Sequence, residues 1–311
     1  MPDCLIISTD AGELNEELSR VADTSMAVEC CTSAEEALVA YADQTILFGS
    51  PDLIATLLPE LPKVDWVQST WAGVKPLTDL DRRDYTLTGV RDVFGPQISE
   101  YVMGYLLAHE LKVVERLKQQ RQQIWFDSPS GILHGKRLGI MGTGSIGAHI
   151  AQMGKAFGQT VTGLSNSGTA LPVFDEVFPV SQIDRFLDGL DYVVSTLPQT
   201  DDTNDLLDRA ALARLPAHAY FINVGRGNVV DDDALVAALE NNELAGAALD
   251  VFDVEPIRKH SPLWTTPGLS ITAHIAAISH PSLIVPIFVD NYRRYVDKQP
   301  LKNMIDFDRG Y

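Results

Sequence analysis

Short apolar runs alternate with longer polar, helix-like segments along almost the whole chain, and this alternation restricts the folds open to it. The first series of runs lies at residues 4–9, 27–31, 45–49, 66–70 and 85–89, with the helix-like segment 33–42 among them. The second series lies at residues 136–142, 160–165, 191–197, 219–225, 245–251 and 269–273. Strands that alternate with helices are typical of a parallel sheet covered by helices on both faces.

Two such series predict an α/β fold of two Rossmann-like, doubly wound parallel-sheet domains with an active-site cleft between them. A long helix is expected from near Ser99 and Glu100 to about Gln120, and a final amphipathic helix at 281–299. Ligands of such sheets bind beyond the carboxyl ends of the strands, so the residues that follow each strand are the candidates for function.

A G-x-G-x-x-G pattern, formed by Gly142, Gly144 and Gly147, stands between a predicted strand and a predicted helix. Gly142 permits the tight turn, Gly144 lets the backbone approach a pyrophosphate, and Gly147 lets the helix pack on the strand. The free N–H groups near Ser145 and Ile146, together with the helix dipole, can then hold phosphates. The pattern predicts a dinucleotide site, although glycine-rich turns also serve packing alone.

The residues that follow the next strand bear on the choice between NAD and NADP. An acidic residue about 20 positions after the glycines holds the ribose hydroxyls of NAD, but here the place falls near Ser165 and Asn166. Without a carboxylate a 2′-phosphate is not repelled, and both side chains can donate to it. Since no Arg or Lys stands nearby, NADP is favoured only slightly, and use of both cofactors stays open.

Arg226, flanked by Gly225 and Gly227, follows the strand at 219–225. A surface arginine in a flexible turn is one interpretation. Flanking glycines, however, let a guanidinium approach a ligand closely, and arginine binds a carboxylate through two parallel hydrogen bonds.

Asp250 and Glu255 follow the strand at 245–251, and His274 follows the strand at 269–273. Solvated loop acids and a core histidine are the alternatives here. Ketone reduction by hydride transfer needs a proton donor, and a histidine serves near neutral pH when a neighbouring carboxylate favours its charged form. An arginine beside the same carbonyl can fix a substrate carboxylate and polarise the C=O bond. We therefore interpret His274 as a proton donor.

Four motifs give the chain a family resemblance: GIMGTGSIG, STLPQTDDTNDLLD, INVGRGNVVDDDALVAALENNELAGAALDVFDVEP and LSITAHIAA. They resemble the D-isomer-specific 2-hydroxyacid dehydrogenases, most closely the glyoxylate/hydroxypyruvate-reductase-like branch. The resemblance implies a discontinuous substrate-binding domain at 1–98 and 279–311 and a dinucleotide-binding domain at 99–278. It also implies a homodimer formed through the cofactor domains.

The resemblance also assigns roles to single residues. It makes Arg226, Glu255 and His274 the catalytic set, with Arg226 also binding substrate. The residues expected to contact the cofactor are Gly142, Gly144, Ser145, Ile146, Gly147, Ser165, Asn166, Leu197, Pro198, Thr203, Val224, Gly225, Asp250 and Ala276. The STWAGV motif resembles the family's substrate loop, and the substrate contacts expected there are Trp71, Ala72, Gly73 and Val74.

Three positions depart from the family pattern. Ala273 stands where the family usually has proline before the histidine, and Trp71 fills a place that is more often small, which predicts a restricted substrate pocket. Asn166 replaces the arginine often found in NADP-using relatives. The other histidines, which have no such companions and are interpreted as structural or exposed, are His109, His134, His149, His218, His260 and His280.

Composition excludes some partners. The formal net charge of −18 disfavours nucleic acid and anionic membranes, which bind clustered positive charge. No run is long enough for a membrane helix, and the first residues do not resemble a signal peptide. Cys4, Cys30 and Cys31 lack metal-like spacing and suit reduced core thiols, which predicts a cytoplasmic protein without a bound metal.

The sequence thus predicts an NAD(P)-dependent oxidoreductase that reduces a small 2-keto acid, such as glyoxylate or hydroxypyruvate, to a D-2-hydroxy acid. Two alternatives stay open. One is a phosphoglycerate-dehydrogenase-like enzyme, and the other is a nucleotide-sensing, corepressor-like binding protein.

Overall fold

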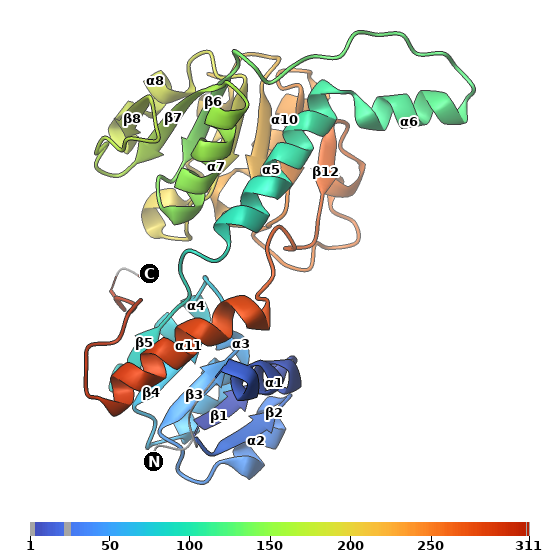
Figure 1. Cartoon of the computed structure of the whole chain (residues 1–311). Helices are drawn as coiled ribbons and strands as arrows, with labels where there is room; N and C mark the ends of the chain where they lie inside the picture. The colour runs from blue at the N-terminus through green and yellow to red at the C-terminus, as the bar shows by residue number, and fades with distance from the viewer. Residues whose placement is uncertain (1–3, 22–25, 309, 311) are drawn as a thin grey trace. The chain divides into compact units, whose positions relative to one another are not determined.

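The computed structural model describes residues 4–21, 26–308 and 310, and it divides the chain into two compact units (Figure 1). Unit 1 comprises residues 1–93 and 279–311, and unit 2 comprises residues 94–278. Each unit is built around one parallel β-sheet with helices packed on it, which confirms the predicted fold class.

Unit 1 contains a five-stranded parallel sheet in the order β2-β1-β3-β4-β5. Its strands are β1 (Cys4–Ile7), β2 (Val28–Cys31), β3 (Ile46–Gly49), β4 (Trp66–Ser69) and β5 (Thr86–Thr88). Its helices are α1 (Ala11–Val21), α2 (Ala34–Ala40), α3 (Pro51–Leu57), α4 (Lys75–Thr78) and α11 (Pro281–Val296), with a 3-10 turn at Leu58–Glu60. The strands β1, β3 and β4 are buried along their whole length, as expected for parallel strands covered on both faces.

The last helix completes the core of unit 1. Phe288 of α11 stacks on Phe48 of β3, with ring centroids 4.3 Å apart, and on Trp66 of β4 at 5.3 Å. Helix α11 also packs against α1. Aromatic rings supply large buried apolar areas, so a segment from the end of the chain stabilises strands from its beginning.

A fully buried polar network joins the same elements. The Gln68 Oε1 atom accepts hydrogen bonds from Thr88 Oγ1 at 2.8 Å and from Asn291 Nδ2 at 3.2 Å. Asn291 Oδ1 in turn accepts the N–H of Lys302 at 2.8 Å. Since buried polar groups are costly unless they are paired, this network fixes α11 and the segment after it against β4 and β5.

The segment that follows α11 lies along the outer edge of the sheet. Gly89 N donates to Asn303 O at 3.0 Å, and Ile305 N donates to Leu87 O at 2.9 Å. A β-bridge joins Thr88 to Met304 in antiparallel orientation. The open edge of β5 is therefore covered, which is how many proteins prevent unwanted strand pairing.

Unit 2 contains a seven-stranded parallel sheet in the order β12-β11-β10-β9-β6-β7-β8. Its strands are β6 (Arg137–Met141), β7 (Thr160–Ser165), β8 (Glu176–Pro179), β9 (Tyr192–Ser195), β10 (Tyr220–Asn223), β11 (Gly246–Leu249) and β12 (Leu269–Ile271). Its α-helices are α5 (Gly95–Glu110), α6 (Val113–Arg121), α7 (Ser145–Ala156), α8 (Ile183–Leu187), α9 (Arg209–Leu212) and α10 (Asp232–Glu240). Its 3-10 turns lie at Val180–Gln182, Asp201–Thr203, Gly227–Val229 and Pro262–Thr265.

The structure corrects the predicted long helix from Ser99 to Gln120. Helix α5 begins earlier, at Gly95, and ends at Glu110, whereas α6 is a separate helix. Between them Lys112 has φ +50°, in the left-handed region, which a right-handed helix cannot continue through. As Figure 1 shows, α6 and the segment after it project away from the rest of unit 2.

Three smaller expectations also change. The short strand β8 at the sheet edge was not predicted, and the final helix ends at Val296 instead of 299. Cys31 is buried but Cys30 is exposed, because β2 is an edge strand and is covered less completely than the central strands. All three cysteines are free thiols. No helix in the described ranges is both long and apolar enough to cross a membrane.

Acidic side chains from three segments, at 231–233, Asp205 and Asp253, interact at the start of α10. Asp231 caps the helix, accepting the N–H of Ala234, and Asp232 is half-buried in the first turn. Burial, together with the charges of Asp253, Asp233, Asp231 and Asp205, raises the pKa of Asp232 from the usual 3.8 to about 6, and burial is the largest of these causes. A carboxyl group with such a pKa destabilises the folded state once it ionises.

This linkage predicts a pH-dependent gain in stability for Asp232→Asn. The folded protein binds the Asp232 proton more tightly than the unfolded chain, so stability is lost as pH rises from about 4 through about 6. The variant lacks this loss, and we expect its Tm to exceed that of the natural protein by about 2 °C at pH 7.5, with the difference shrinking toward pH 4. Thermal denaturation followed by circular dichroism at both pH values measures it.

The matched control is Asp184→Asn, at an exposed aspartate in the first turn of α8, whose charge is not among those that raise the pKa of Asp232. Its Tm difference should depend little on pH. An equal gain for Asp232→Asn at both pH values, or a loss at pH 7.5, would contradict the assignment.

Candidate active site

The glycine turn between β6 and α7 has the shape that a pyrophosphate requires. Gly142 has φ +101°, a conformation that side chains disfavour. A Cβ atom at Gly147 would lie 2.0 Å from Gly142 O, so only glycine allows α7 to approach the strand this closely. A Cβ atom at Gly144, in contrast, would meet nothing within 4 Å. The turn is therefore closely packed at Gly147, where α7 meets the strand, and open at Gly144, where phosphates would bind.

The first turn of α7 supplies the donors for such an anion. Gly144 precedes the helix in an extended conformation, and its carbonyl accepts the N–H of Ala148 at 2.8 Å. The N–H groups of Ser145, Ile146 and Gly147 have no carbonyl of a preceding turn to bind, as in every helix. With the helix dipole behind them they suit a phosphate, so the residues present fit the predicted dinucleotide.

The loop after β7 is rich in hydroxyl groups. Ser165 is half-buried at the strand end, and its Oγ accepts the N–H of Gly168 at 3.2 Å, whereas Asn166 is exposed. Ser167 Oγ and Thr169 Oγ1 lie 2.7 Å apart. Loop 165–169 thus contains neutral donors and no charged side chain.

The loop after β9 is held by Thr203. Its hydroxyl donates to Pro198 O at 2.8 Å and accepts the N–H of Thr200 at 2.9 Å. The Thr203 hydroxyl therefore has partners within its own loop. The loop begins with Leu197, which is half-buried, and Pro198, which is exposed. A Cβ atom at Gly225 would lie 2.5 Å from Leu197 O, so the loops after β9 and β10 pack against each other without room for a side chain.

Arg226 lies in the loop that follows β10. Val224, in the same loop, is buried, and its N–H donates to Ser195 O at 3.0 Å. Asn223, which the sequence analysis missed, holds this loop from below. Its Nδ2 donates to Arg226 O at 2.9 Å, and its Oδ1 accepts the N–H of Gly225 at 3.1 Å. Burial lowers the pKa of Arg226, and the charge of Glu255 acts against that shift. The guanidinium is thus partly desolvated and interacts with a carboxylate from the next loop.

Glu255 and His274 form a directly bonded pair. Glu255 Oε2 lies 2.9 Å from His274 Nδ1, and Glu255 Oε1 accepts the N–H of Phe252 at 2.9 Å. The carboxylate is therefore fixed by the backbone while it binds the imidazole. With Nδ1 bound to Glu255, the other ring nitrogen of His274 points away from the pair and is free to serve a ligand.

The His274 loop is built around Asp250, which is only 1% exposed. Its Oδ1 accepts the N–H of Ile275 at 2.9 Å, and its Oδ2 accepts the N–H of Ala276 at 2.8 Å. The N–H of His274 donates to Asp250 O at 2.8 Å, and His274 has φ +56°. The structure gives Asp250 a role in shaping this loop.

In unit 2 the structure therefore brings Arg226, Glu255 and His274 together at the carboxyl ends of neighbouring strands. The substrate contacts predicted in unit 1 lie between β4 and α4, where Trp71 and Ala72 are exposed, Gly73 is half-buried and Val74 is buried. Ser69 fixes this loop: its Oγ accepts the N–H of Trp71 at 3.0 Å and lies 3.1 Å from Trp71 O.

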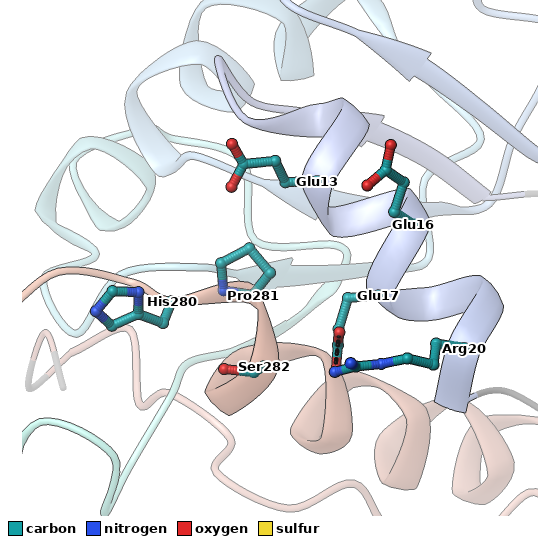
Figure 2. Close-up of a pocket in the computed structure, with 7 residues that line it drawn as sticks. All are labelled: Glu13, Glu16, Glu17, Arg20, His280, Pro281 and Ser282. Atoms are coloured by element: carbon teal, nitrogen blue, oxygen red, sulfur yellow. Dashed lines mark ion pairs between the residues drawn. The ribbon is translucent and has the colours of Figure 1, made fainter.

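A surface hollow elsewhere in unit 1 contains no predicted site residue. It has a volume of about 520 Å³ and is lined by Glu13, Glu16, Glu17, Arg20, His280, Pro281 and Ser282. Figure 2 shows Glu17 paired with Arg20 along α1, facing the start of α11. Among the residues that the structure describes, no group of three or more His, Cys, Asp or Glu side chains is arranged to hold a metal ion.

Comparisons with known proteins place this geometry in a family. A family model described as "D-isomer specific 2-hydroxyacid dehydrogenase, NAD binding domain" matches residues 103–276. Glyoxylate/hydroxypyruvate reductase B from Klebsiella pneumoniae subsp. pneumoniae is 34% identical over 251 residues, which cover 78% of this chain and 77% of the relative.

Solved structures agree over the whole chain. A D-isomer specific 2-hydroxyacid dehydrogenase family protein from Aeromonas salmonicida has a TM-score of 0.94 at 39% identity and covers 99% of both chains. A D-isomer specific 2-hydroxyacid dehydrogenase from Xanthobacter autotrophicus, solved with NADPH and MES, has a TM-score of 0.88 at 29% identity over 100% of both chains. The resemblance found in the sequence is thereby confirmed: the chain belongs to the D-isomer-specific 2-hydroxyacid dehydrogenase family and is an oxidoreductase that uses a nicotinamide dinucleotide cofactor.

Proposed function

We propose that the protein reduces a small 2-keto acid of the glyoxylate or hydroxypyruvate type to the D-2-hydroxy acid. Unit 2 binds the dinucleotide, and unit 1 supplies the substrate loop. The observation that carries the proposal is the Glu255–His274 pair at 2.9 Å, with the charge of Arg226 acting on the same carboxylate. The substrate class is supported by the relative from Klebsiella pneumoniae, whose name specifies glyoxylate and hydroxypyruvate.

The glycine turn and the first turn of α7 would hold the pyrophosphate of the cofactor, with the loops after β7, β9 and β10 around the remainder. When bound, the nicotinamide supplies the hydride for the keto carbon. His274 donates the proton to the oxygen that gains negative charge, and Glu255 stabilises the imidazolium and keeps its orientation. Arg226 places positive charge beside the carbonyl and the carboxylate of the substrate.

The charge of the protein adds weight to the role of Arg226. A formal net charge of −18 repels an anionic substrate at long range, so the site needs a local cation. Arg226 is partly buried, and a charge in a partly desolvated place interacts more strongly than one in water. The N–H groups of Ala72, Gly73 and Val74 are the donors proposed for the substrate carboxylate in unit 1. Trp71, 40% exposed beside them, would limit the size of the substrate.

Two other functions would produce different results in one assay. A phosphoglycerate-dehydrogenase-like enzyme would oxidise the phosphorylated hydroxy acid and turn over glyoxylate poorly. A corepressor-like binding protein would bind the dinucleotide without turnover. The proton-donor pair distinguishes catalysis from binding, since binding alone needs no such pair.

We expect His274→Ala to lower kcat for hydroxypyruvate reduction by about 100-fold or more, the scale of lost general acid catalysis. Binding of the cofactor, measured by quenching of its fluorescence, should change little because the glycine turn is intact. Steady-state rates with glyoxylate, hydroxypyruvate, pyruvate and 3-phosphoglycerate, in the presence of each nicotinamide cofactor, measure both activity and substrate class.

His218→Ala, an exposed histidine away from the pair, is the control and should retain the natural rate. A His274→Ala enzyme with nearly normal kcat would remove His274 from the reaction. Absence of turnover with all four substrates, together with tight dinucleotide binding, would favour the binding-protein alternative.

We also propose a modest preference for NADPH. The loop after β7 offers the hydroxyl groups of Ser165, Ser167 and Thr169 and no carboxylate to repel a 2′-phosphate. It also offers no cation to neutralise that phosphate. The relative from Xanthobacter autotrophicus was solved with NADPH, which supports the direction of the preference.

The expected preference is about 10-fold in kcat/KM, or about 1.4 kcal/mol. Ser165→Asp should reverse it, because the new charge repels only the phosphorylated cofactor, whereas Asn166→Arg should strengthen it. Rates with NADPH and NADH for the three proteins decide the matter. A natural enzyme that clearly prefers NADH, or a Ser165→Asp variant that still prefers NADPH, would contradict the proposal.

We further propose that the chain forms a homodimer through the arm at 111–132. Helix α6 has no buried residue, and two of its apolar side chains are largely exposed: Val114 is 74% and Leu117 51% exposed. Trp125, which follows the helix, is 93% exposed. The arm is nevertheless ordered by its own contacts, since Arg116 donates to the carbonyls of Phe126 at 3.2 Å and Ser128 at 2.7 Å. A nine-residue helix without packing is marginal in water, and an apolar surface of this kind is best covered by the same surface of a second copy.

The pair of changes Val114→Glu and Leu117→Glu should convert the dimer to a monomer, because it buries two charges in the proposed interface. Light scattering after size exclusion should give about twice 34.1 kDa for the natural chain and about 34.1 kDa for the variant. Val39→Glu, which alters an 89% exposed valine on α2, is the control and should leave the mass unchanged. A monomeric natural chain at micromolar concentration would refute the dimer.

A further inference from the structure

A chain of hydroxyl groups links helix α5 to the loop that presents His274, and none of these groups is used in the reaction described above. The Tyr101 hydroxyl lies 2.7 Å from Thr272 Oγ1. Thr272 Oγ1 donates to Asp250 Oδ1 at 2.5 Å. Tyr101 comes from the second turn of α5, whereas Thr272 and Asp250 follow β12 and β11, so the chain joins a helix to two strand ends.

The direction of these hydrogen bonds follows from their chemistry. An ionised carboxylate only accepts, so the single hydroxyl hydrogen of Thr272 is directed at Asp250. The length of 2.5 Å is typical of a hydroxyl group bound to a carboxylate. Tyr101 must then be the donor to Thr272. Burial raises the pKa of Tyr101 above its usual value, which keeps that hydroxyl protonated.

The same carboxylate holds the loop that contains His274. Asp250 accepts the N–H groups of Ile275 and Ala276, and its own carbonyl accepts the N–H of His274. The loop has three backbone bonds to one residue, and His274 is kept in the left-handed region by them. Any rotation of the Asp250 carboxylate would therefore move the backbone that carries the imidazole.

We propose that Tyr101 is a positioning residue for His274, acting through Thr272 and Asp250. The inference rests on the proposed function, because it assigns Tyr101 to the step in which His274 donates a proton. Tyr101 saturates the Thr272 oxygen, Thr272 then points its hydrogen at Asp250, and Asp250 holds residues 274–276 in one arrangement. Hydrogen bonds in such a chain strengthen one another. The hydroxyl of Tyr101, which lies on a helix, also restricts the rotation of the Thr272 side chain.

This role predicts a change in kcat with little change in KM. The substrate is bound by Arg226 and by the loop in unit 1, and neither touches Tyr101 in the proposed mechanism. Removing the Tyr101 hydroxyl leaves the Thr272 hydroxyl held by Asp250 alone and the His274 loop less restricted. Tyr101→Phe should lower kcat by about fivefold, the factor expected for one hydrogen bond, while KM for the keto acid stays within twofold.

The test is a double-mutant cycle in the full chain with Tyr101→Phe, Thr272→Val and both together. If Tyr101 acts through Thr272, adding Tyr101→Phe to Thr272→Val lowers kcat no further. Thr272→Ser keeps the hydroxyl group and should retain the natural kcat. Tyr295→Phe, which loses a hydroxyl bond to Asp65 in unit 1, is the matched control and should leave kcat unchanged.

Hydrogen exchange of a peptide spanning 272–276 gives a readout that does not depend on turnover. The amides of Ile275 and Ala276 should exchange about fivefold faster in Tyr101→Phe and at the natural rate in Tyr295→Phe. An unchanged exchange rate would overturn the proposal. So would a kcat effect that persists in the Thr272→Val background, or an equal change in kcat and KM.

Failure of the proposed function would be recognised separately. If the natural enzyme reduces none of the keto acids, the reaction assigned above is wrong, and the exchange experiment alone decides whether Tyr101 positions the loop. Faster exchange then supports the positioning of His274 by Tyr101, and unchanged exchange refutes it.

Discussion

A buried carboxylate at the end of β11 cannot remain in the interior without hydrogen-bond donors, and the loop after β12 supplies them to Asp250. An unpaired buried charge costs several kcal/mol. The loop at 274–276 therefore folds over the Asp250 carboxylate so that the N–H groups of Ile275 and Ala276 can bind it. That closure puts His274 in a backbone conformation that few residues adopt. The position of the His274 imidazole thus follows from the need of buried Asp250 for hydrogen-bond donors, and Glu255 lies within hydrogen-bond distance of that position.

The order of strands in unit 2 explains why these residues meet. Strands β12, β11 and β10 are adjacent, and His274, Asp250 and Arg226 follow them in that order. Because all pairs are parallel, their carboxyl ends share one edge of the sheet. The glycine turn follows β6, which lies one strand beyond β9 on the same sheet. Topology alone therefore gathers groups that are up to 132 residues apart in the chain, from Gly142 to His274.

The features that could be predicted from the sequence are those with strong local patterns. Buried parallel strands are continuous apolar runs, and the glycine turn has a fixed spacing, so both were found. The break at Lys112 was missed because the apolar pattern continues through it and a lysine with positive φ has no signature in sequence. Strand β8 was missed because four edge residues that end in proline do not form a recognisable run. Asn223 was missed because its partners are backbone atoms of Gly225 and Arg226, which leave no pattern in the side chains, and Tyr101 because its partner, the Thr272 hydroxyl, is 171 residues away in the chain.

The segments that complete unit 1 have a consequence for the order in which the chain acquires structure during synthesis. Phe288 and Asn291 of α11 fill the core, and residues 302–305 cover the edge of β5, yet all are made after the whole of unit 2. Unit 2 is one continuous stretch, 94–278, and has every strand of its sheet once that stretch has left the ribosome. Domains usually fold in the order of their synthesis. In this chain the core of unit 1 is complete only when α11 is present, and α11 is synthesised after unit 2. The apolar face of β3 and β4 that Phe288 covers therefore stays exposed in a nascent chain until the whole of unit 2 has been made.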